Sequence, residues 1–377
     1  MRVQVVDPSA YTPSYDHALC AALARAGTQV ELVRSPYAYG TAPPPDGYTV
    51  RELFYRHSRG PAGSRLRLAT KLLEHVPDMV AYRRHALGAE VVHFQWVSVQ
   101  PIDWRLLPRR PVILTAHDLL PREPRPLQVR AQRRIYESVD AIVVHSEFGR
   151  GQLVDELGIA SERVRVIHHG AFDYLAATPP GSLPAELGAP NSEPTDEAPR
   201  VVMFFGILRP YKGIKVLLDA WRALGEARGR AELWIVGHPR MPIDDLLAGA
   251  PPGVKSVSRF VSDPELVACF RRADVVVLPY LHTGRFDFSG VLAIALAFGK
   301  PAVVSDIGSF NEVAHAGAAR LVPPGDVESL ADALGALLAD EQQRERLSAG
   351  ARAAVQGPYS WDAAAEQTLA LYRELVG

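Results

Sequence analysis

Short runs of β-branched and apolar residues alternate with longer amphipathic stretches along nearly the whole chain. Runs such as VQVVD at 3–7 and AIVVHS at 141–146 have the length and composition of buried strands, whereas 15–27 and 126–138 carry apolar residues at helical spacing. Strands that alternate with helices form βαβ units, in which the strands are parallel. The pattern therefore predicts an α/β protein built on parallel sheets.

The alternation occurs twice, on either side of a proline-rich stretch. The predicted strands lie at 3–7, 29–35, 90–96, 111–118, 141–146 and 164–170, and then at 200–206, 232–237, 256–261, 274–280, 301–306 and 319–324. Between the two sets, Thr178–Pro199 contains six prolines and no Lys or Arg, which is typical of an exposed linker. Two Rossmann-like domains joined by a linker follow, with the ligand expected in the crevice at the carboxyl ends of the strands.

The predicted boundaries put the first domain at 1–175, the linker at 176–199 and the second domain at 200–358. A last helix, from about Trp361 to Val376, follows the break at Gly357-Pro358, and we expect this segment (359–377) to pack back on the first domain.

Charge and cysteine content narrow the function classes. The 41 Lys and Arg nearly balance the 42 Asp and Glu, which argues against a dedicated nucleic-acid binder. The two cysteines lie far apart, so neither a disulfide framework nor a cysteine-rich metal site is predicted. The first apolar run is too short for a signal-peptide core, and no run approaches the length of a membrane span. We expect a cytoplasmic protein.

Two segments have the pattern of phosphate-binding sites. In FFGILRPYKGIKVLLDAW (204–221) a strand ends at Gly206, Arg209 and Lys212 occupy a turn, and a helix starts near Gly213. Backbone amides at a helix start and two cations suit a diphosphate, although a surface turn with solvated charges fits the local pattern equally well.

The second segment is FDFSGVLAIALAFGKP (286–301), where Ser289 and Gly290 open an Ala-rich helix. Its first amides could hold a phosphate, but the pattern alone favours a buried helix with an ordinary serine cap.

Together these segments resemble the donor-binding domain of the retaining family 4 glycosyltransferases, which have the GT-B fold. The resemblance rests on strand-FFGxxRxYKG-helix, followed about 80 residues later by SGVLxxALAFGKPxVxSDxGxxxE, and extends to VIHHGAF (166–172), RFVSDPEL (259–266) and YSWDAAAEQTLALY (359–372). It implies transfer of a sugar from a UDP- or GDP-sugar to a hydroxyl of a glycan, lipid-linked or small-molecule acceptor. It also implies retained anomeric configuration and no metal ion or other cofactor.

The resemblance assigns roles to residues of the second domain. Arg209 and Lys212 would clamp the diphosphate and stabilise the leaving nucleotide, with Arg209 replacing the family's arginine, whose position holds Ile207 here. The remaining donor-site residues would be Gly206, the distal-phosphate residues Ser289, Gly290, Val291 and Leu292, and the base-bordering residues Arg259, Phe260 and Val261.

The chain departs from the family at two glutamates that stand eight residues apart, one near the donor sugar and one on the ribose. Phe286 and Ile294 occupy these positions here, and Asp287 and Glu312 are the candidate replacements. The departure leaves open a nucleotide-sugar-binding protein without turnover. Among enzymes, the alternative is another GT-B reaction on nucleotide sugars, such as epimerisation.

In the first domain, the strand PVILTAHD ends in His117 and Asp118. His117 resembles the family histidine that contacts the donor sugar and faces the reaction centre. Asp118 would be its partner or a nearby structural anchor, and is also a candidate for the acceptor site. His145, His168 and His169 also fall at strand ends, but they lack the paired spacing of zinc ligands, so no metal is predicted.

Further acceptor residues are expected at neighbouring strand ends. Tyr15 and Asp16 stand near the place where many relatives have a Gly-Gly pair, and either contact the acceptor or belong to a simple helix start capped by Ser14. Gln95 and Trp96 follow another strand and would line the acceptor pocket, although Trp96 fits a core position equally well.

Positive charge gathers in the first domain. Residues 1–175 carry 22 Lys and Arg against 18 Asp and Glu, concentrated in 51–84 and 105–134. In glycosyltransferases with lipid-linked acceptors such a basic, partly apolar face can rest on an anionic membrane. An Arg-rich surface exposed only to solvent is the alternative.

Overall fold

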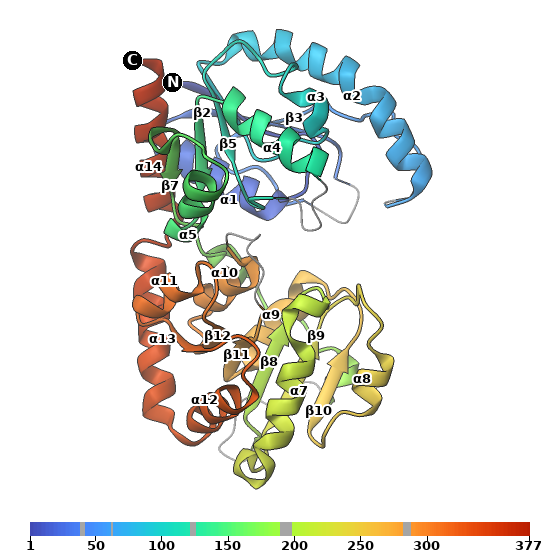
Figure 1. Ribbon diagram of the computed structural model, residues 1–377, viewed down its shortest axis with the longest axis vertical. Coiled ribbons are helices and arrows are strands. Elements are labelled where there is room, and N and C mark those ends of the chain that lie inside the picture. The colour runs from blue at the N-terminus through green and yellow to red at the C-terminus, as the bar shows by residue number, and fades with distance from the viewer. Residues whose placement is uncertain (38–41, 62, 121–125, 189–197, 282–287) are drawn as a thin grey trace. The chain divides into compact units, whose positions relative to one another are not determined.

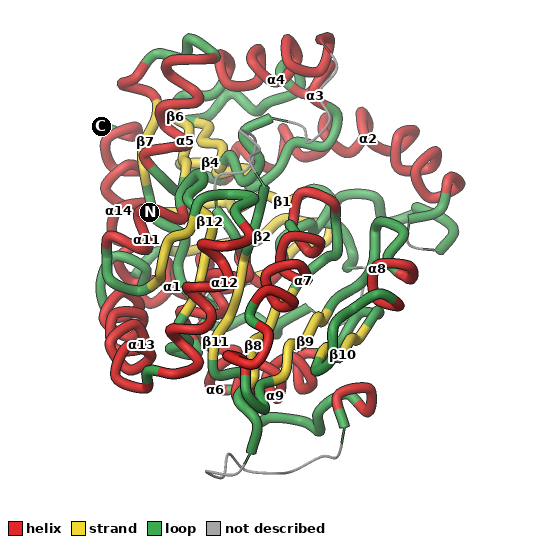
Figure 2. The backbone as a smooth tube through the Cα atoms, turned by 60° about the horizontal axis from the view of Figure 1, so that its bottom comes forward, coloured by secondary structure: helices red, strands yellow, loops and turns green. Residues whose placement is uncertain are grey.

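The computed structural model describes residues 1–377 except 38–41, 62, 121–125, 189–197 and 282–287 (Figure 1). Its described residues divide into two compact units, the first formed by 1–170 and 359–377 and the second by 171–281 and 288–358. In each unit helices flank a parallel sheet (Figure 2), which confirms the predicted α/β class with two Rossmann-like sheets.

The first unit contains a seven-stranded sheet in the order β3-β2-β1-β4-β5-β6-β7. Its strands are β1 Arg2–Asp7, β2 Gln29–Arg34, β3 Thr49–Glu52, β4 Val91–Phe94, β5 Val112–Thr115, β6 Ala141–Val144 and β7 Val164–Val166. The side chains of β4, β5 and β6 are fully buried, as apolar runs between two helical layers require. The sequence did not predict β3, because this edge strand reads TVRE and has no apolar run.

The helices of this unit cover both faces of the sheet. They are α1 Pro13–Arg25, α2 Arg65–His85, α3 Gln100–Asp103, α4 Pro126–Ser138, α5 Glu147–Gly151 with its π-helical extension Gln152–Glu156, and α14 Trp361–Val376. Helix α14 packs on α1, which confirms the predicted return of the last helix to the first domain. The Tyr372 hydroxyl lies 2.7 Å from His93 Nδ1 on β4, so α14 is part of this unit's core.

The second unit contains a six-stranded sheet in the order β10-β9-β8-β11-β12-β13. Its strands are β8 Val201–Phe205, β9 Glu232–Val236, β10 Val254–Val257, β11 Val275–Leu278, β12 Ala302–Ser305 and β13 Ala319–Val322. Its helices are α6 Asp173–Ala177, α7 Ile214–Ala223, α8 Asp244–Ala248, α9 Asp263–Arg272, α10 Gly290–Ala297, α11 Phe310–His315, α12 Val327–Ala339 and α13 Glu341–Gln356. The strand order reverses between β8 and β11, where ligands of doubly wound folds bind.

Two segments differ from the sequence-based expectation. The strand expected at 256–261 ends at Val257, so the residues that follow lie in a loop. The proline-rich segment is packed on the second unit at its described start. Gly181 N donates to Pro264 O, and Lys255 Nζ donates to the carbonyl of the buried Leu187.

Candidate active site

The turn between β8 and α7 is shaped by glycines. Gly213 has a φ of +71°, and a Cβ there would lie 1.8 Å from the carbonyl oxygen of Pro279. Glycine therefore lets the turn contact the segment that follows β11. The same contact brings the predicted cations Arg209 and Lys212 to the point where the strand order reverses.

Lys212 is held by an aromatic residue that the sequence analysis did not single out. Its Nζ lies 3.6 Å from the centre of the Tyr280 ring. Tyr280 is 1% exposed, and its hydroxyl lies 3.3 Å from Ser289 Oγ. Tyr280 thus links the cationic turn to the start of α10. The available signal was the position of Tyr280 at the end of DVVVLPY, which places it near the carboxyl end of the sheet, where Gly206 follows β8.

Arg209 has an unused hydrogen-bond donor. Its Nε is buried and meets no hydrogen-bond partner among the residues that the structure describes. A buried donor without a partner is costly, and a guanidinium bound to an oxyanion satisfies it. The side chain is therefore suited to an anionic ligand.

The start of α10 lies close to the same turn. Ser289 is the N-cap residue, yet its side chain makes no capping hydrogen bond. A Cβ on Gly206 would lie 3.2 Å from Val291 Cγ2, so the end of β8 contacts the first turn of this helix. The first amides of α10, at Gly290, Val291 and Leu292, have no acceptor within the helix and can bind an oxyanion.

The residues expected to border the base lie in the loop after β10. The Arg259 guanidinium forms ion pairs with Glu186 at 2.9 Å and with Glu265 at 2.8 Å. The Phe260 ring is 64% exposed and stacks on His238 at 4.3 Å, next to the half-buried Val261. Phe260 therefore offers the open aromatic face in this loop.

Glu312 and Asp287 are the candidate replacements for the family's two glutamates. Glu312 lies in the first turn of α11, whose Phe310 ring is 5.3 Å from Tyr280. Its helix thus begins beside the Lys212–Tyr280 pair. Asp287 lies outside the described residues.

In the first unit, His117 lies between aromatic rings. Trp96 stacks on its ring with centroids 5.2 Å apart, and Tyr15 meets it edge-on at 4.5 Å. Burial and the neighbouring imidazoles lower the pKa of His117 well below its usual value, so the ring is neutral near pH 7. A neutral imidazole has one donor and one acceptor for a ligand or a protein group.

Three further histidines surround His117. His93, His145 and His169 are buried, and burial lowers their pKa values to about 3, 4 and 3. Across the described ranges no group of three or more His, Cys, Asp and Glu side chains is arranged to hold a metal ion. Of the three, His145 lies within hydrogen-bond distance of His117, with 3.3 Å between His145 Nε2 and His117 Nδ1, a contact that strand-end positions alone did not reveal.

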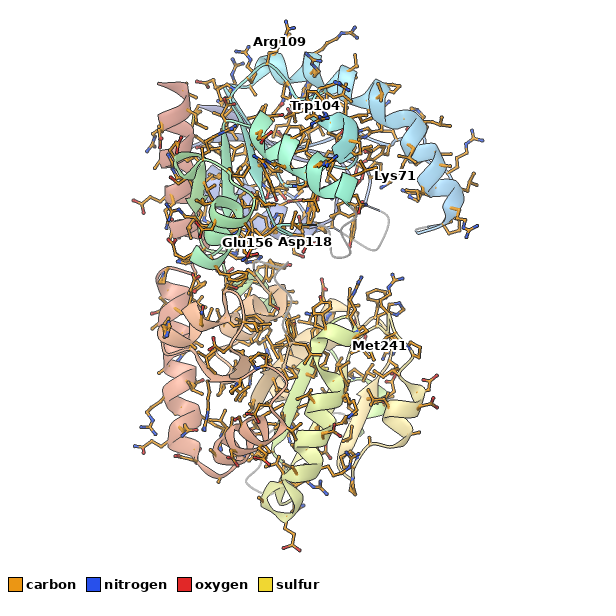
Figure 3. The ribbon with its side chains drawn as sticks, in the orientation of Figure 1. Lys71, Trp104, Arg109, Asp118, Glu156 and Met241 are labelled. Atoms are coloured by element: carbon orange, nitrogen blue, oxygen red, sulfur yellow. The ribbon has the colours of Figure 1, made fainter. Side chains whose placement is uncertain are left out.

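The other predicted acceptor residues divide into two groups. Gln95, Trp96, His117 and Asp118 line a pocket of about 130 Å³ in this unit (Figure 3 labels Asp118). Asp16, by contrast, is fully buried on α1 and accepts a hydrogen bond from Thr12 Oγ1. In this position its carboxyl group supports the β1–α1 loop.

Each half of the chain matches the model of a known protein family. Residues 199–340 match the family model "Glycosyl transferases group 1", and residues 15–171 match "Glycosyltransferase Family 4". The chain belongs to glycosyltransferase family 4. As a family 4 protein it is a retaining glycosyltransferase that uses a nucleotide-sugar donor.

Two curated relatives in this family act on inositol-containing acceptors according to their names. The phosphatidyl-myo-inositol mannosyltransferase of Mycobacterium leprae is 32% identical over 63% of this chain and 60% of that protein. The D-inositol 3-phosphate glycosyltransferase of Corynebacterium urealyticum is 28% identical over 83% of this chain and 78% of that protein. The first alignment therefore spans less than two thirds of the relative's length.

A solved structure confirms the fold. Sucrose-phosphate synthase from Thermosynechococcus elongatus superposes on the chain with a TM-score of 0.74, at 21% identity, and covers 100% of this chain and 99% of that one. The family 4 chain therefore has the GT-B fold.

Proposed function

We propose that this enzyme transfers a hexosyl unit from a UDP- or GDP-sugar to an acceptor hydroxyl without a metal ion. The observation that supports this proposal is the link from Lys212 through Tyr280 to Ser289 at the start of α10, with the buried Arg209 Nε on the same turn as Lys212. Two cations and a set of oriented amides supply the positive charge that a departing diphosphate needs. His117 contacts a hydroxyl of the transferred sugar.

The reaction follows from these roles. The bond between the anomeric carbon and the donor phosphate breaks, and the acceptor oxygen bonds to that carbon on the same face. The acceptor proton passes to the leaving phosphate, so the protein needs no carboxylate base. Arg209, Lys212 and the amides of Gly290 and Val291 stabilise the negative charge that builds on the phosphate.

The test compares two lysines of the same segment. Lys212→Ala removes a cation from the diphosphate and should lower kcat by about 10²–10³-fold. Lys215→Ala is the matched control, because Lys215 lies on α7, is exposed and pairs with Asp219. The assay follows nucleotide release and glycosylated product, after a thermal-shift panel of UDP-, GDP-, ADP- and dTDP-sugars has identified the donor.

Three outcomes would contradict the proposal. Near-normal sugar transfer by Lys212→Ala would contradict the assignment of Lys212 to the donor diphosphate site. An altered nucleotide sugar without glycosylated product would favour epimerisation. Donor binding with neither hydrolysis nor transfer would favour a binding protein without turnover.

A lipid-linked acceptor is favoured by the surface of α2. Apolar side chains on this helix are exposed, namely Leu66, Leu68, Leu72, Leu73, Val76 and Val80. Arg65, Arg67 and Lys71 lie among them (Figure 3 labels Lys71). Leucines flanked by cations fit the surface of an anionic bilayer, where the apolar groups enter the headgroup region. The name of the Mycobacterium leprae relative, which specifies a phosphatidylinositol acceptor, agrees with such a substrate.

Vesicle sedimentation tests this surface. The enzyme should sediment with phosphatidylglycerol vesicles at low salt and remain in solution with phosphatidylcholine vesicles. Leu72→Asp combined with Leu73→Asp should abolish sedimentation, whereas Val376→Asp, which alters an exposed apolar residue on α14, should not. Equal sedimentation of all three proteins would contradict the membrane proposal. No helix in the described ranges is long and apolar enough to cross a membrane.

A further inference from the structure

A continuous hydrogen-bond chain runs through His117. His117 Nε2 lies 3.1 Å from Gln95 Oε1, and His117 Nδ1 lies 3.3 Å from His145 Nε2. At the far end, His145 Nδ1 lies 3.0 Å from the carbonyl oxygen of Ile167. The chain therefore contains three hydrogen bonds and two imidazole rings.

Counting protons decides the direction of each bond. The Ile167 carbonyl can only accept, so His145 Nδ1 carries a proton and donates it. In a neutral ring His145 Nε2 is then an acceptor, and His117 Nδ1 must be the donor that meets it. His117 Nε2 is left as an acceptor, so the third proton comes from the Gln95 amide.

The surroundings agree with this count. The ring of His117 is held in its plane by Trp96 and Tyr15, so its nitrogens keep their partners. Burial keeps both imidazoles neutral, since it lowers the pKa of His145 to about 4 and that of His117 well below its usual value. As placed, Gln95 Nε2 is buried and meets no hydrogen-bond partner among the residues that the structure describes, while Oε1 faces His117. Turning the amide by half a turn about its terminal bond exchanges the two atoms, so that Nε2 donates to His117 Nε2.

We propose that His145 is a positioning residue that fixes the proton of His117 on Nδ1 and thereby presents Nε2 of His117 as a hydrogen-bond acceptor. Gln95 occupies this acceptor in the empty enzyme. A substrate hydroxyl replaces the Gln95 amide and donates to His117. The site therefore selects a hydroxyl group at this point, and His117 does not protonate the leaving phosphate.

The proton position is measured directly by NMR. Protein labelled with ¹⁵N-histidine is recorded at neutral pH, and His117→Gln assigns the His117 signals. We expect a protonated Nδ1 and an unprotonated Nε2 in the wild-type enzyme, the reverse of the tautomer that free histidine prefers. A His117 protonated on Nε2 would overturn the inference, and this spectrum needs no variant of His145.

Two substitutions test the role of His145. His145→Leu removes the acceptor, so His117 should shift toward the Nε2-protonated form. His145→Gln keeps an acceptor oxygen near the same place and should restore the wild-type tautomer. An unchanged His117 tautomer in a folded His145→Leu protein would overturn the inference. His315→Gln, at an exposed histidine of the second unit, serves as the control.

The effect of His145 on catalysis rests on the proposed function, and it is measured separately from the tautomer, through kcat and donor affinity. His145→Leu should lower kcat about tenfold or more and leave donor affinity nearly unchanged, with recovery in His145→Gln. If the His117 tautomer in His145→Leu changes as expected but kcat does not, the hydrogen-bond chain is supported and the proposed contact between His117 and the substrate is contradicted. If both fail, His145 is not a positioning residue.

Discussion

The ammonium group of Lys212 lies over the ring of Tyr280, 3.6 Å from its centre. A cation held in this way is worth about 0.5–2 kcal/mol, and it keeps Lys212 in a fixed position before a ligand arrives. Tyr280→Leu should therefore weaken the binding of the donor nucleotide roughly 2- to 30-fold. Tyr280→Phe keeps the ring and should bind within about twofold of wild type. Calorimetric titration with UDP or GDP measures both, and equal loss in the two variants would assign the effect to the hydroxyl instead.

Gly213→Ala should destabilise the second unit strongly. The new Cβ would lie 1.8 Å from the Pro279 carbonyl oxygen, in a backbone conformation that already disfavours a side chain. We expect a loss of about 3 kcal/mol or more in the free energy of unfolding. Gly225→Ala is the control, because Gly225 also has a positive φ but a Cβ there meets nothing within 4 Å. Urea unfolding that gives the same loss for both variants would show that the close approach to Pro279 is unimportant.

Asp16 should make the stability of the first unit depend on pH. Burial first, and then the neighbouring Asp7 carboxyl, raise the pKa of Asp16 well above 3.8. The folded state therefore binds this proton more tightly than the unfolded state, and stability falls as pH rises from about 4 through the raised pKa, by up to about 1.4 kcal/mol per pH unit.

The variant Asp16→Asn removes this titration. The free energy of unfolding of the variant, measured against pH, should lack the decline seen in wild type, so the variant gains relative stability as pH rises. Parallel pH profiles for the two proteins would contradict the prediction. Asp7 is also buried with a raised pKa, so any decline that remains in the variant reports on Asp7.

The two cysteines should be inert in the native protein. Cys20 on α1 and Cys269 on α9 are both fully buried, and burial raises the pKa of each thiol, that of Cys269 to about 12. Thiolate is the reactive form, so an aromatic disulfide reagent should modify neither residue until its unit opens. Mass spectrometry after timed labelling in urea then reports the opening of each unit separately. Rapid labelling without denaturant would contradict the described burial.

Much of the architecture was predictable because buried parallel strands are short apolar runs. The runs at 141–146 and 274–280 contain β6 and β11, whereas the edge strand β3 has three exposed residues among four and gave no such signal. The return of α14 followed from the family resemblance and the proline break before it. Sequence spacing thus reports burial between two layers, and it fails for a strand such as β3 whose side chains are mostly exposed.

The candidate site was less predictable, since its contacts join distant segments. Glycines and cations at a strand end indicated the turn at 206–213, but Tyr280 belongs to an apolar run and resembled a core residue. The pairing of Arg259 with Glu186 links positions 73 residues apart. The hydrogen-bond chain from Gln95 to Ile167 likewise crosses several strands, and no local pattern encodes it.

Helix α14 has a consequence for how the enzyme is made. The first unit receives this helix from the last residues of the chain, after the entire second unit has been translated. Until then the face of α1 that packs on α14 is uncovered, and His93 lacks the Tyr372 hydroxyl. During translation, all segments of the second unit are therefore synthesised before the first unit has its last helix. A chain that terminates before α14 would contain the complete second unit and an incomplete first unit.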